Sequence, residues 1–241
     1  MFRLTFLTLI CLLLTSCNEQ ADSQRTYILS TGTTGGTFYP VGVALSTLVS
    51  ASKDIDFSLT AISSAGSMEN IKLLRDDQAQ LAFILGIFGA WAYGGSGPII
   101  NPQANLRSIS AMWPNVEHFV LKSDLAVTGT MQDLKLLNGE RYSIGMRNSG
   151  AEFTGFYIFD ALDIDWSEEL SVAYMGYGPS ANALQDGNIV GMNVPAGPPV
   201  TAITRAYALL GDEMTILNFT EDEIKSLNYE FPLWVSYELK P

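Results

Sequence analysis

One stretch constrains this chain more than any other: residues 30–40, which read Ser-Thr-Gly-Thr-Thr-Gly-Gly-Thr-Phe-Tyr-Pro. An apolar run at 27–29 precedes it, and apolar residues at helical spacing follow from Val41. The pattern predicts a strand, a glycine-rich turn and a helix, with unpaired N–H groups and the positive end of the helix dipole aimed at one point. Such a point favours an anion. The glycine spacing fits neither a P-loop nor a dinucleotide fingerprint, and a merely tight connection remains the alternative.

The N-terminal residues indicate export. Arg3 precedes an apolar run over 4–14, which is too short to span a bilayer and has the build of a secretory signal over residues 1–16. Leu-Thr-Ser-Cys at 14–17 resembles a bacterial lipobox, which implies cleavage before Cys17 and a lipid on that cysteine. We therefore expect a periplasmic protein, anchored to a bacterial membrane by lipid through a polar tether at 17–25. An ordinary signal peptide that contains a cysteine is the alternative.

Cysteine, histidine and charge exclude several classes of site. Cys11 would leave with the signal and Cys17 would carry lipid, so the mature chain would have no disulfide, thiolate metal site or cysteine nucleophile. His118 is the only histidine, which excludes a histidine metal cluster or triad; we expect a structural role rather than a pH switch. The formal net charge of -12 disfavours nucleic acid and repels anions at long range, so an anion site must use local dipoles. We expect no metal and no cofactor.

The first part of the chain, residues 26–122, shows a strand–helix rhythm that we interpret as lobe 1. A second small-residue turn at 63–67 opens another helix, with Ser67 as its expected N-cap. The predicted strands are 27–30, 57–62, 81–85, 106–112 and 119–121, and the first helix covers about 40–51.

Residues 123–219 repeat this arrangement of a strand, a small polar turn and a helix, and are interpreted as lobe 2. Ser149 and Glu152 form a capping-box pattern, so we expect Glu152 to be a cap partner rather than a catalytic acid. Thr220 and Glu223 form a second box, at the start of a segment, 220–241, expected to return toward lobe 1. The predicted strands are 142–144, 172–175 and 189–194, and helices follow Gly176 and the Pro-rich stretch at 195–199.

Strands that alternate with helices predict an α/β fold with mainly parallel sheets, in which ligands gather at the carboxyl ends of strands. The hydroxyl-rich turns lie at those ends, so helix N-termini from both halves would converge on one cleft. That arrangement describes a binding protein better than an enzyme. A hydrolase would need a nucleophile elbow, and Gly-Gly-Ser-Gly at 94–97 does not fit one.

The ordered set of motifs resembles the TAXI solute receptors of TRAP transporters over roughly residues 27–241. The matching stretches are Thr-Gly-Thr-Thr-Gly-Gly-Thr-Phe-Tyr-Pro-Val-Gly at 31–42, Ser-Ala-Gly-Ser-Met-Glu-Asn at 64–70 with Leu-Leu-Arg at 73–75, Gln-Leu-Ala-Phe at 80–83, Asn-Ser-Gly-Ala-Glu at 148–152, Leu-Gln-Asp-Gly-Asn-Ile at 184–189 and Pro-Ala-Gly-Pro-Pro at 195–199.

The resemblance implies a two-lobed type II periplasmic binding protein fold, each lobe a sheet flanked by helices. It implies capture of a small organic acid or amino acid such as glutamate, an anionic or zwitterionic solute, for a sodium-coupled TRAP permease in the membrane. A lipoprotein that senses a ligand for a signalling partner is the alternative, ahead of a periplasmic hydrolase. The expected ligand-binding residues are Thr33, Thr34, Gly35, Gly36, Thr37, Tyr39, Ser64, Ser67, Asn70, Arg147, Asn148, Ser149, Gly150, Ala196 and Gly197.

Three departures from the family pattern affect these expectations. Leu-Gly-Ile at 85–87 is apolar where the family usually has polar residues, so a ligand contact is expected to be missing. Arg147 stands where the family has a small residue or proline; we hypothesise that it selects acids, with an outward-pointing side chain as the alternative. Family members continue past Pro241, so the resemblance implies a truncated chain with an incomplete lobe 1.

Overall fold

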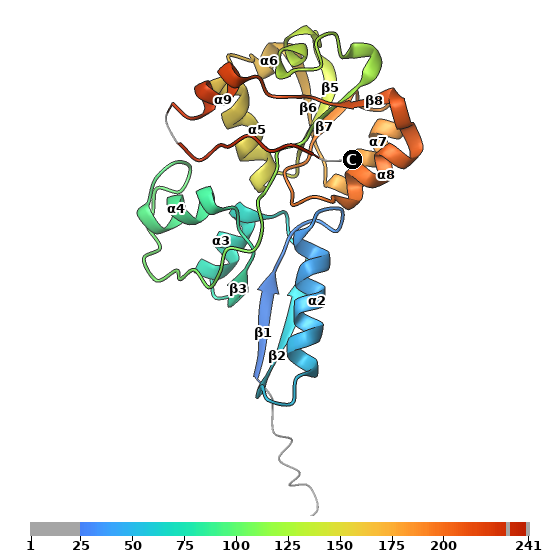
Figure 1. The fold of residues 1–241 in the computed structure, drawn as a ribbon. Helices are drawn as coiled ribbons and strands as arrows, with labels where there is room; N and C mark the ends of the chain where they lie inside the picture. The colour runs from blue at the N-terminus through green and yellow to red at the C-terminus, as the bar shows by residue number, and fades with distance from the viewer. Residues whose placement is uncertain (1–24, 230–231, 240–241) are drawn as a thin grey trace, which may run out of the picture.

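The computed structural model describes residues 25–229 and 232–239. The expected signal peptide, most of the tether and the lipidation site at Cys17 lie outside these residues. Within them the chain forms a two-lobed α/β fold, built on a three-stranded sheet of order β2-β1-β3 and a five-stranded sheet of order β6-β5-β7-β4-β8. Figure 1 shows the two sheets in separate halves of the molecule, joined by extended chain.

The first lobe is an all-parallel sheet with helices around it. β1 pairs with β2 on one side and with β3 on the other. Helix α2 packs on β1 and β2, and α3 packs on β3. The elements are β1 (Arg25–Ser30), α2 (Phe38–Ala51), β2 (Phe57–Ile62), α3 (Ser67–Arg75), β3 (Leu81–Ala82) and α4 (Gly86–Gly94).

The second lobe has a mixed sheet, so the prediction of mainly parallel sheets holds for only part of it. β5 is parallel to both β6 and β7, whereas β4 runs antiparallel to β7 and β8. The elements are β4 (Phe119–Lys122), η1 (Ser123–Leu125), η2 (Met131–Leu136), β5 (Glu140–Gly145), α5 (Gly150–Ala161), α6 (Trp166–Glu169), β6 (Leu170–Tyr174), α7 (Tyr177–Gln185), β7 (Gly191–Asn193), α8 (Thr201–Leu210), η3 (Gly211–Glu213), β8 (Met214–Ile216) and α9 (Glu221–Leu227).

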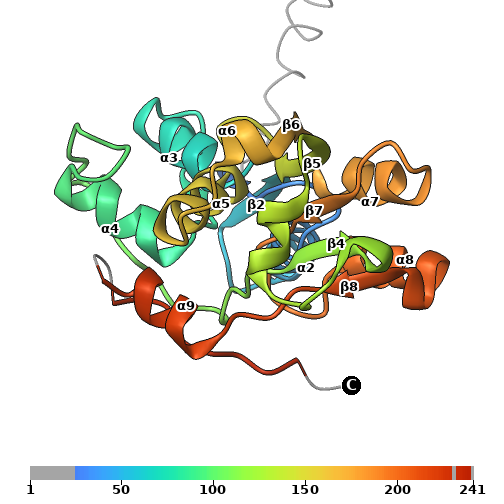
Figure 2. The ribbon, with the colours of Figure 1, turned by 90° about the horizontal axis from the view of Figure 1, so that it is seen from above.

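The core of the second lobe lies on both faces of this sheet. Successive side chains of a strand point to opposite faces, so Phe119 joins the cluster that includes Tyr142 and Phe159, while Val120 joins the cluster around Leu184 and Met192. Seen from above, α5 lies on one side of β7 and α7 on the other (Figure 2). Each fully buried side chain of this size contributes roughly 1.5–3 kcal/mol.

One lobe assignment and one strand prediction in the middle of the chain are wrong, although the strand predicted at 119–121 is confirmed as β4. Residues 119–121 were expected in lobe 1, but β4 lies between β7 and β8 in the second sheet. Its first three residues are fully buried, and a central position is where a strand buries both faces and satisfies both backbone edges. Residues 106–112 form no strand, because they are mostly exposed and pair with no neighbouring strand.

The segment after residue 220 also differs from expectation. The capping box of Thr220 and Glu223 is confirmed in both directions, and it begins α9. However, α9 packs on α5, and Trp234 stacks on Tyr157 with ring centroids 6.1 Å apart. The described part of 220–239 therefore stays on the second lobe instead of returning to the first, held there by the packing of α9 on α5 and the half-buried Trp234 on Tyr157.

Candidate functional site

A cavity of about 30 Å³ lies between the lobes, and four helices begin at it. Two of the helices, α2 and α3, belong to the first lobe and two, α5 and α7, to the second. The lining residues are Gly32, Thr33, Gly36, Thr37, Phe38, Ala65, Gly66, Ser67, Leu85, Gly150, Ala151, Tyr177, Pro195 and Ala196. Each helix dipole presents its positive end to the same small volume.

Three of these four helices start without a side-chain cap. Thr37, Gly66 and Gly176 are the N-cap residues of α2, α3 and α7, and none makes a side-chain hydrogen bond to the first turn. Only α5 is capped, by Ser149, whose Oγ accepts from Glu152 N at 3.0 Å. Backbone N–H groups in the first turn of a helix lack intrahelical partners, so uncapped helix starts leave donors for a ligand.

The cavity wall is neutral. None of the residues that line it has a charged side chain. Thr33 Oγ1 is buried and has no hydrogen-bond partner among the described residues. A buried unpaired hydroxyl is costly unless something binds it, so Thr33 is suited to contact an oxygen-rich solute. The site therefore offers backbone dipoles and hydroxyls rather than cationic side chains.

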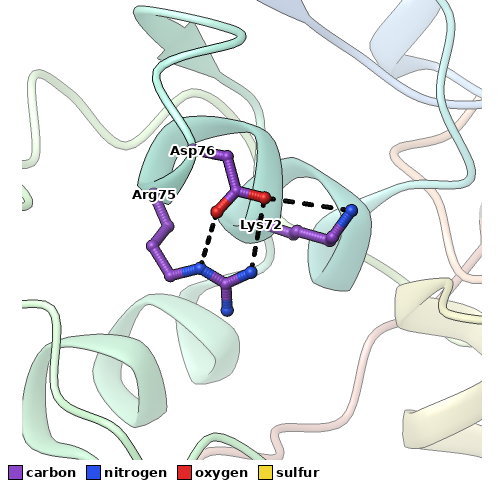
Figure 3. Close-up of polar contacts among 3 residues, drawn as sticks. All are labelled: Lys72, Arg75 and Asp76. Carbon is purple, nitrogen blue, oxygen red and sulfur yellow. Dashed lines mark hydrogen bonds and ion pairs between the residues drawn. The ribbon is translucent and has the colours of Figure 1, made fainter.

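The ion pairs found among the described residues lie away from the cavity, on α3 and α9. Figure 3 shows Asp76 at the end of α3 between Arg75 and Lys72, with Arg75 Nε 2.9 Å from Asp76 Oδ1. The hydrogen bond from Arg75 lowers the pKa of the Asp76 carboxyl. The basic residues complement the negative C-terminal end of the α3 dipole, opposite the end that faces the cavity.

Asn70, an expected ligand contact, is instead a cross-link inside the first lobe. Its Oδ1 accepts from Ser30 Oγ at 2.5 Å and from Ser64 Oγ at 2.6 Å. Its Nδ2 donates to Thr31 O at 2.6 Å and to Phe83 O at 2.7 Å. These four bonds use the full hydrogen-bonding capacity of the amide, which leaves neither Asn70 nor the Ser64 hydroxyl proton for a solute.

Gly35 and Gly197 are at contacts between the lobes and do not line the cavity. Ala202 N, in the first turn of α8, donates to Gly35 O at 3.1 Å, and Thr37 Oγ1 donates to Gly197 O. A Cβ at Gly35 would lie 2.6 Å from Gly178 N. Backbone therefore meets backbone across the cleft.

The turn before α5 supplies a further contact between the lobes. Glu69 N donates to Asn148 O at 3.2 Å, while Glu152 Oε2 accepts from Asn148 N at 2.6 Å. Glu152 is thus a cap partner as predicted, but to the residue before the N-cap, because Asn148 has a left-handed backbone with φ 61°.

Arg147 adopts the outward alternative. Its side chain is exposed and its Cζ lies 3.7 Å from the centre of the Tyr174 ring, a cation–π geometry. It is not among the residues that line the cavity. The guanidinium of Arg147 therefore contacts the Tyr174 ring and not the cavity.

Of the expected ligand contacts, the cavity brings together Thr33, Gly36, Thr37, Ser67, Gly150 and Ala196. Ser67 also accepts from Leu85 N at 3.0 Å, and the N-cap of α3 is Gly66 rather than Ser67. The expected contacts outside the lining are Thr34, Gly35, Tyr39, Ser64, Asn70, Arg147, Asn148, Ser149 and Gly197.

Sequence reasoning missed Tyr177 and Pro195. Tyr177 begins α7 at the cavity, and its hydroxyl donates to Pro195 O at 3.0 Å. The sequence did contain a signal for Tyr177: Gly176 follows a strand and precedes a helix, as the glycines of the other three turns at the cavity do. Leu85 lines the cavity, which agrees with the expectation that this position offers an apolar side chain and no polar contact to a ligand. Phe38, Phe83 and Trp113 form an aromatic cluster beside it, with centroids 5.5–6.0 Å apart.

His118 is buried and its Nδ1 is 2.9 Å from Val194 O, and burial lowers the pKa of the imidazole. Within residues 25–229 and 232–239, no group of histidine, cysteine and acidic side chains is arranged to hold a metal ion. No helix in the same ranges has the length and apolar character needed to cross a membrane.

Comparisons with known proteins agree with this architecture. The model of the NMT1-like family matches residues 29–240. A binding-protein component of an ABC phosphonate transporter from Pseudomonas aeruginosa has a TM-score of 0.55 at 11% identity, covering 87% of this chain and 74% of that chain. A structure from work on glutathione import in Streptococcus mutans has a TM-score of 0.53 at 13% identity, covering 83% and 78%.

The ligand-binding component of an ABC-type import system from Staphylococcus aureus has a TM-score of 0.50 at 13% identity, over 81% of this chain. This chain spans 60% of the length of that protein. At such identities the likeness establishes a shared fold.

Proposed function

Because this chain belongs to the NMT1-like family, we propose that it is an extracytoplasmic solute receptor that captures a small anion between its lobes. The observation that carries the proposal is the convergence of four helix N-termini, two from each lobe, on one cavity. Three of them lack side-chain caps, so the donors that a bound anion needs are already in place.

The chemistry of the wall favours a carboxylate or a similar oxyanion. A helix N-terminus contributes about 0.3–1 kcal/mol to a nearby negative charge, and more in partly buried geometry. Four such ends, with the hydroxyls of Thr33 and Ser67, supply a site for an anion without an arginine. They also act locally, which a chain with a formal net charge of -12 requires.

Our more specific proposal is that the solute is an organic acid or amino acid, such as glutamate, and that the partner is a TRAP permease, as the TAXI resemblance implies. The structural neighbours named above are components of ABC importers, so an ABC permease is the competing partner. Lipid anchoring at Cys17 and a periplasmic location complete the proposal. Co-purification of the Cys17-anchored protein with each type of permease distinguishes the two partners.

A thermal-shift screen tests the function directly. A ligand that binds only the native state raises the apparent stability, by about 2.7 kcal/mol at a hundredfold excess over Kd. The screen compares L-glutamate, succinate and acetate with their full amides, in which no carboxylate remains. Shifts with the acids and none with the amides are expected; no shift with any acid contradicts the proposal.

A variant tests whether the solute binds in this cavity. A Cβ at Gly36 would lie 3.1 Å from the Tyr177 ring, so the larger Gly36→Val side chain fills the cavity. It should abolish the thermal shift while the protein alone still unfolds cooperatively. A normal shift in Gly36→Val would place binding elsewhere and would contradict this site.

A further inference from the structure

A buried carboxyl group lies directly behind the cavity. Val116 bridges Ala196, and Phe119 pairs with Asn193 in the same antiparallel register. This register places Glu117 opposite Pro195, which lines the cavity. Alternation along the strand then puts Glu117 on the same face of the sheet as Phe119, the face covered by α5.

Four buried oxygen atoms gather in this region without hydrogen-bond partners among the described residues. They are Glu117 Oε2, Tyr142 Oη, Thr154 Oγ1 and Asn193 Oδ1. The other end of the Asn193 amide donates to Ala151 O at 3.2 Å, in the first turn of α5. The cluster therefore lies beneath the helix N-terminus that forms part of the cavity wall.

No described cation compensates Glu117. The ionisable groups that face it are Tyr142 from β5 and Tyr177 from α7. Burial raises the pKa of both phenols, and the charge of Glu117 raises it further. His118 is adjacent in sequence, but its side chain belongs to the opposite face and its Nδ1 contacts Val194 O. The described ion pairs lie elsewhere, on α3 and α9.

The other acidic groups near the cleft are already engaged. Glu152 accepts from Asn148 N and Glu69 accepts from Ala65 N, each at 2.6 Å. Arg147 stacks on Tyr174. Glu117 is thus a half-buried residue whose carboxyl oxygen Oε2 is buried, with neither a counter-charge nor a backbone donor among the described residues, which favours the neutral form of the acid.

We propose that Glu117 is a specificity-determining residue that couples anion capture in the cleft to the binding of one proton. The inference rests on the proposed function. A neutral Glu117 leaves the converging helix dipoles unopposed, whereas an ionised Glu117 places a second negative charge behind Pro195. When an anion enters while Glu117 is ionised, the carboxylate takes one proton from solvent and becomes a carboxylic acid.

Physical estimates set the expected size of the effect. Burial raises the pKa of the Glu117 carboxyl to about 8, and the nearby Thr154 hydroxyl opposes the shift. The solute would lie on the order of 8 Å from the carboxyl group, one cross-strand spacing plus a side chain. At an effective dielectric constant of about 20, two such charges weaken binding roughly thirtyfold. The affinity for an anion should therefore fall as the pH rises from 7 to 9.

Calorimetric titration with L-glutamate at pH 7.0, 8.0 and 9.0 tests the coupling, since the net charge of this probe changes little over that range. Buffers of different ionisation enthalpy report the protons taken up. The wild type should bind about eightfold more weakly at pH 9.0 than at pH 7.0 and take up protons at pH 8.0. Glu117→Gln should bind with equal affinity throughout, while the exposed control Glu140→Gln should keep the wild-type dependence.

The outcomes separate the two proposals. Equal wild-type affinity at all three pH values, or an unchanged dependence in Glu117→Gln, overturns the coupling and leaves the receptor function standing. Absence of L-glutamate binding at every pH overturns both for this solute. Carbon NMR of the wild type labelled at glutamate Cδ needs no solute, and a Glu117 resonance that titrates near the ordinary glutamate pKa would also overturn the coupling.

Discussion

Gly35→Ala should weaken solute binding while leaving the fold intact. Gly35 lies in the turn before α2, and it has no positive φ that would strain an alanine. The added Cβ would lie 2.6 Å from Gly178 N and 3.2 Å from Gly178 Cα, both backbone atoms of the second lobe. A backbone cannot rotate out of the way as a side chain can, so the two lobes must move apart.

The geometry gives the magnitude. Restoring ordinary contact, at 3.4 Å or more, requires a separation of about 0.8 Å at this point. The bond from Ala202 N to Gly35 O, now 3.1 Å, would then be stretched beyond hydrogen-bonding range. Losing one such bond and leaving its groups unpaired costs about 1–3 kcal/mol. If the solute binds only the closed form, its Kd rises by the same free energy, roughly five- to 150-fold.

Gly178→Ala is the matched control, because a Cβ at Gly178 meets nothing within 4 Å. Gly178 lies in the first turn of α7, where alanine is the better helix former, so this variant should bind normally and be slightly more stable. Calorimetry with the acid found by the thermal-shift screen gives Kd for each variant, and X-ray scattering gives the fraction of closed molecules. Tight solute binding by Gly35→Ala, or equal losses of affinity in both variants, would refute the role of the backbone seam, by which we mean the contacts between the lobes at Gly35 and Gly197.

Other predictions concern stability and location. The folded pKa of the Glu117 carboxyl, about 8, lies above the unfolded value of 4.5. The contribution of this group to the free energy of unfolding is therefore complete below pH 4.5 and is lost as the pH rises through 8. In Glu117→Gln, the fall in the free energy of unfolding over this pH range, measured by chemical denaturation, should be smaller by up to about 5 kcal/mol. Asn70→Ala removes four buried hydrogen bonds and should lower the free energy of unfolding by about 3–5 kcal/mol in urea, whereas a loss below 1 kcal/mol would contradict the cross-link. Thr220→Ala should cost about 1 kcal/mol through the lost cap of α9, and Thr220→Ser should restore it. Cys17→Ser should move the protein from the membrane fraction to the soluble fraction; continued labelling by a fatty acid would disprove lipidation there.

The α/β class and the convergence of helix starts could be predicted from the sequence because both depend on local patterns. Residues 30–40 and 63–67 join an apolar strand to a periodic helix, and the structure places both turns at the carboxyl ends of paired parallel strands. Gly36, Thr37 and Ser67 reach the cavity for this reason.

The failures depend on long-range pairing or on side-chain direction. Nothing within residues 119–122 shows that β4 would pair with β7 and β8, which come about 70 to 95 residues later. A polar residue beside a turn can point into the cleft or into its own lobe. Asn70 points inward to the backbone of Thr31, directly after β1, and Arg147 turns to the Tyr174 ring. Such choices follow from packing that a short motif does not record.

The size of the cavity between the lobes also bears on kinetics. A space of about 30 Å³ has room for little more than water, so the seam through Gly35 and Gly197 must part before glutamate can enter. Glutamate therefore enters the open form and the lobes close around it, so the observed association rate should level off at high solute concentration, at the rate of closing. The time needed to form a few backbone contacts, rather than diffusion, would set how fast this receptor loads.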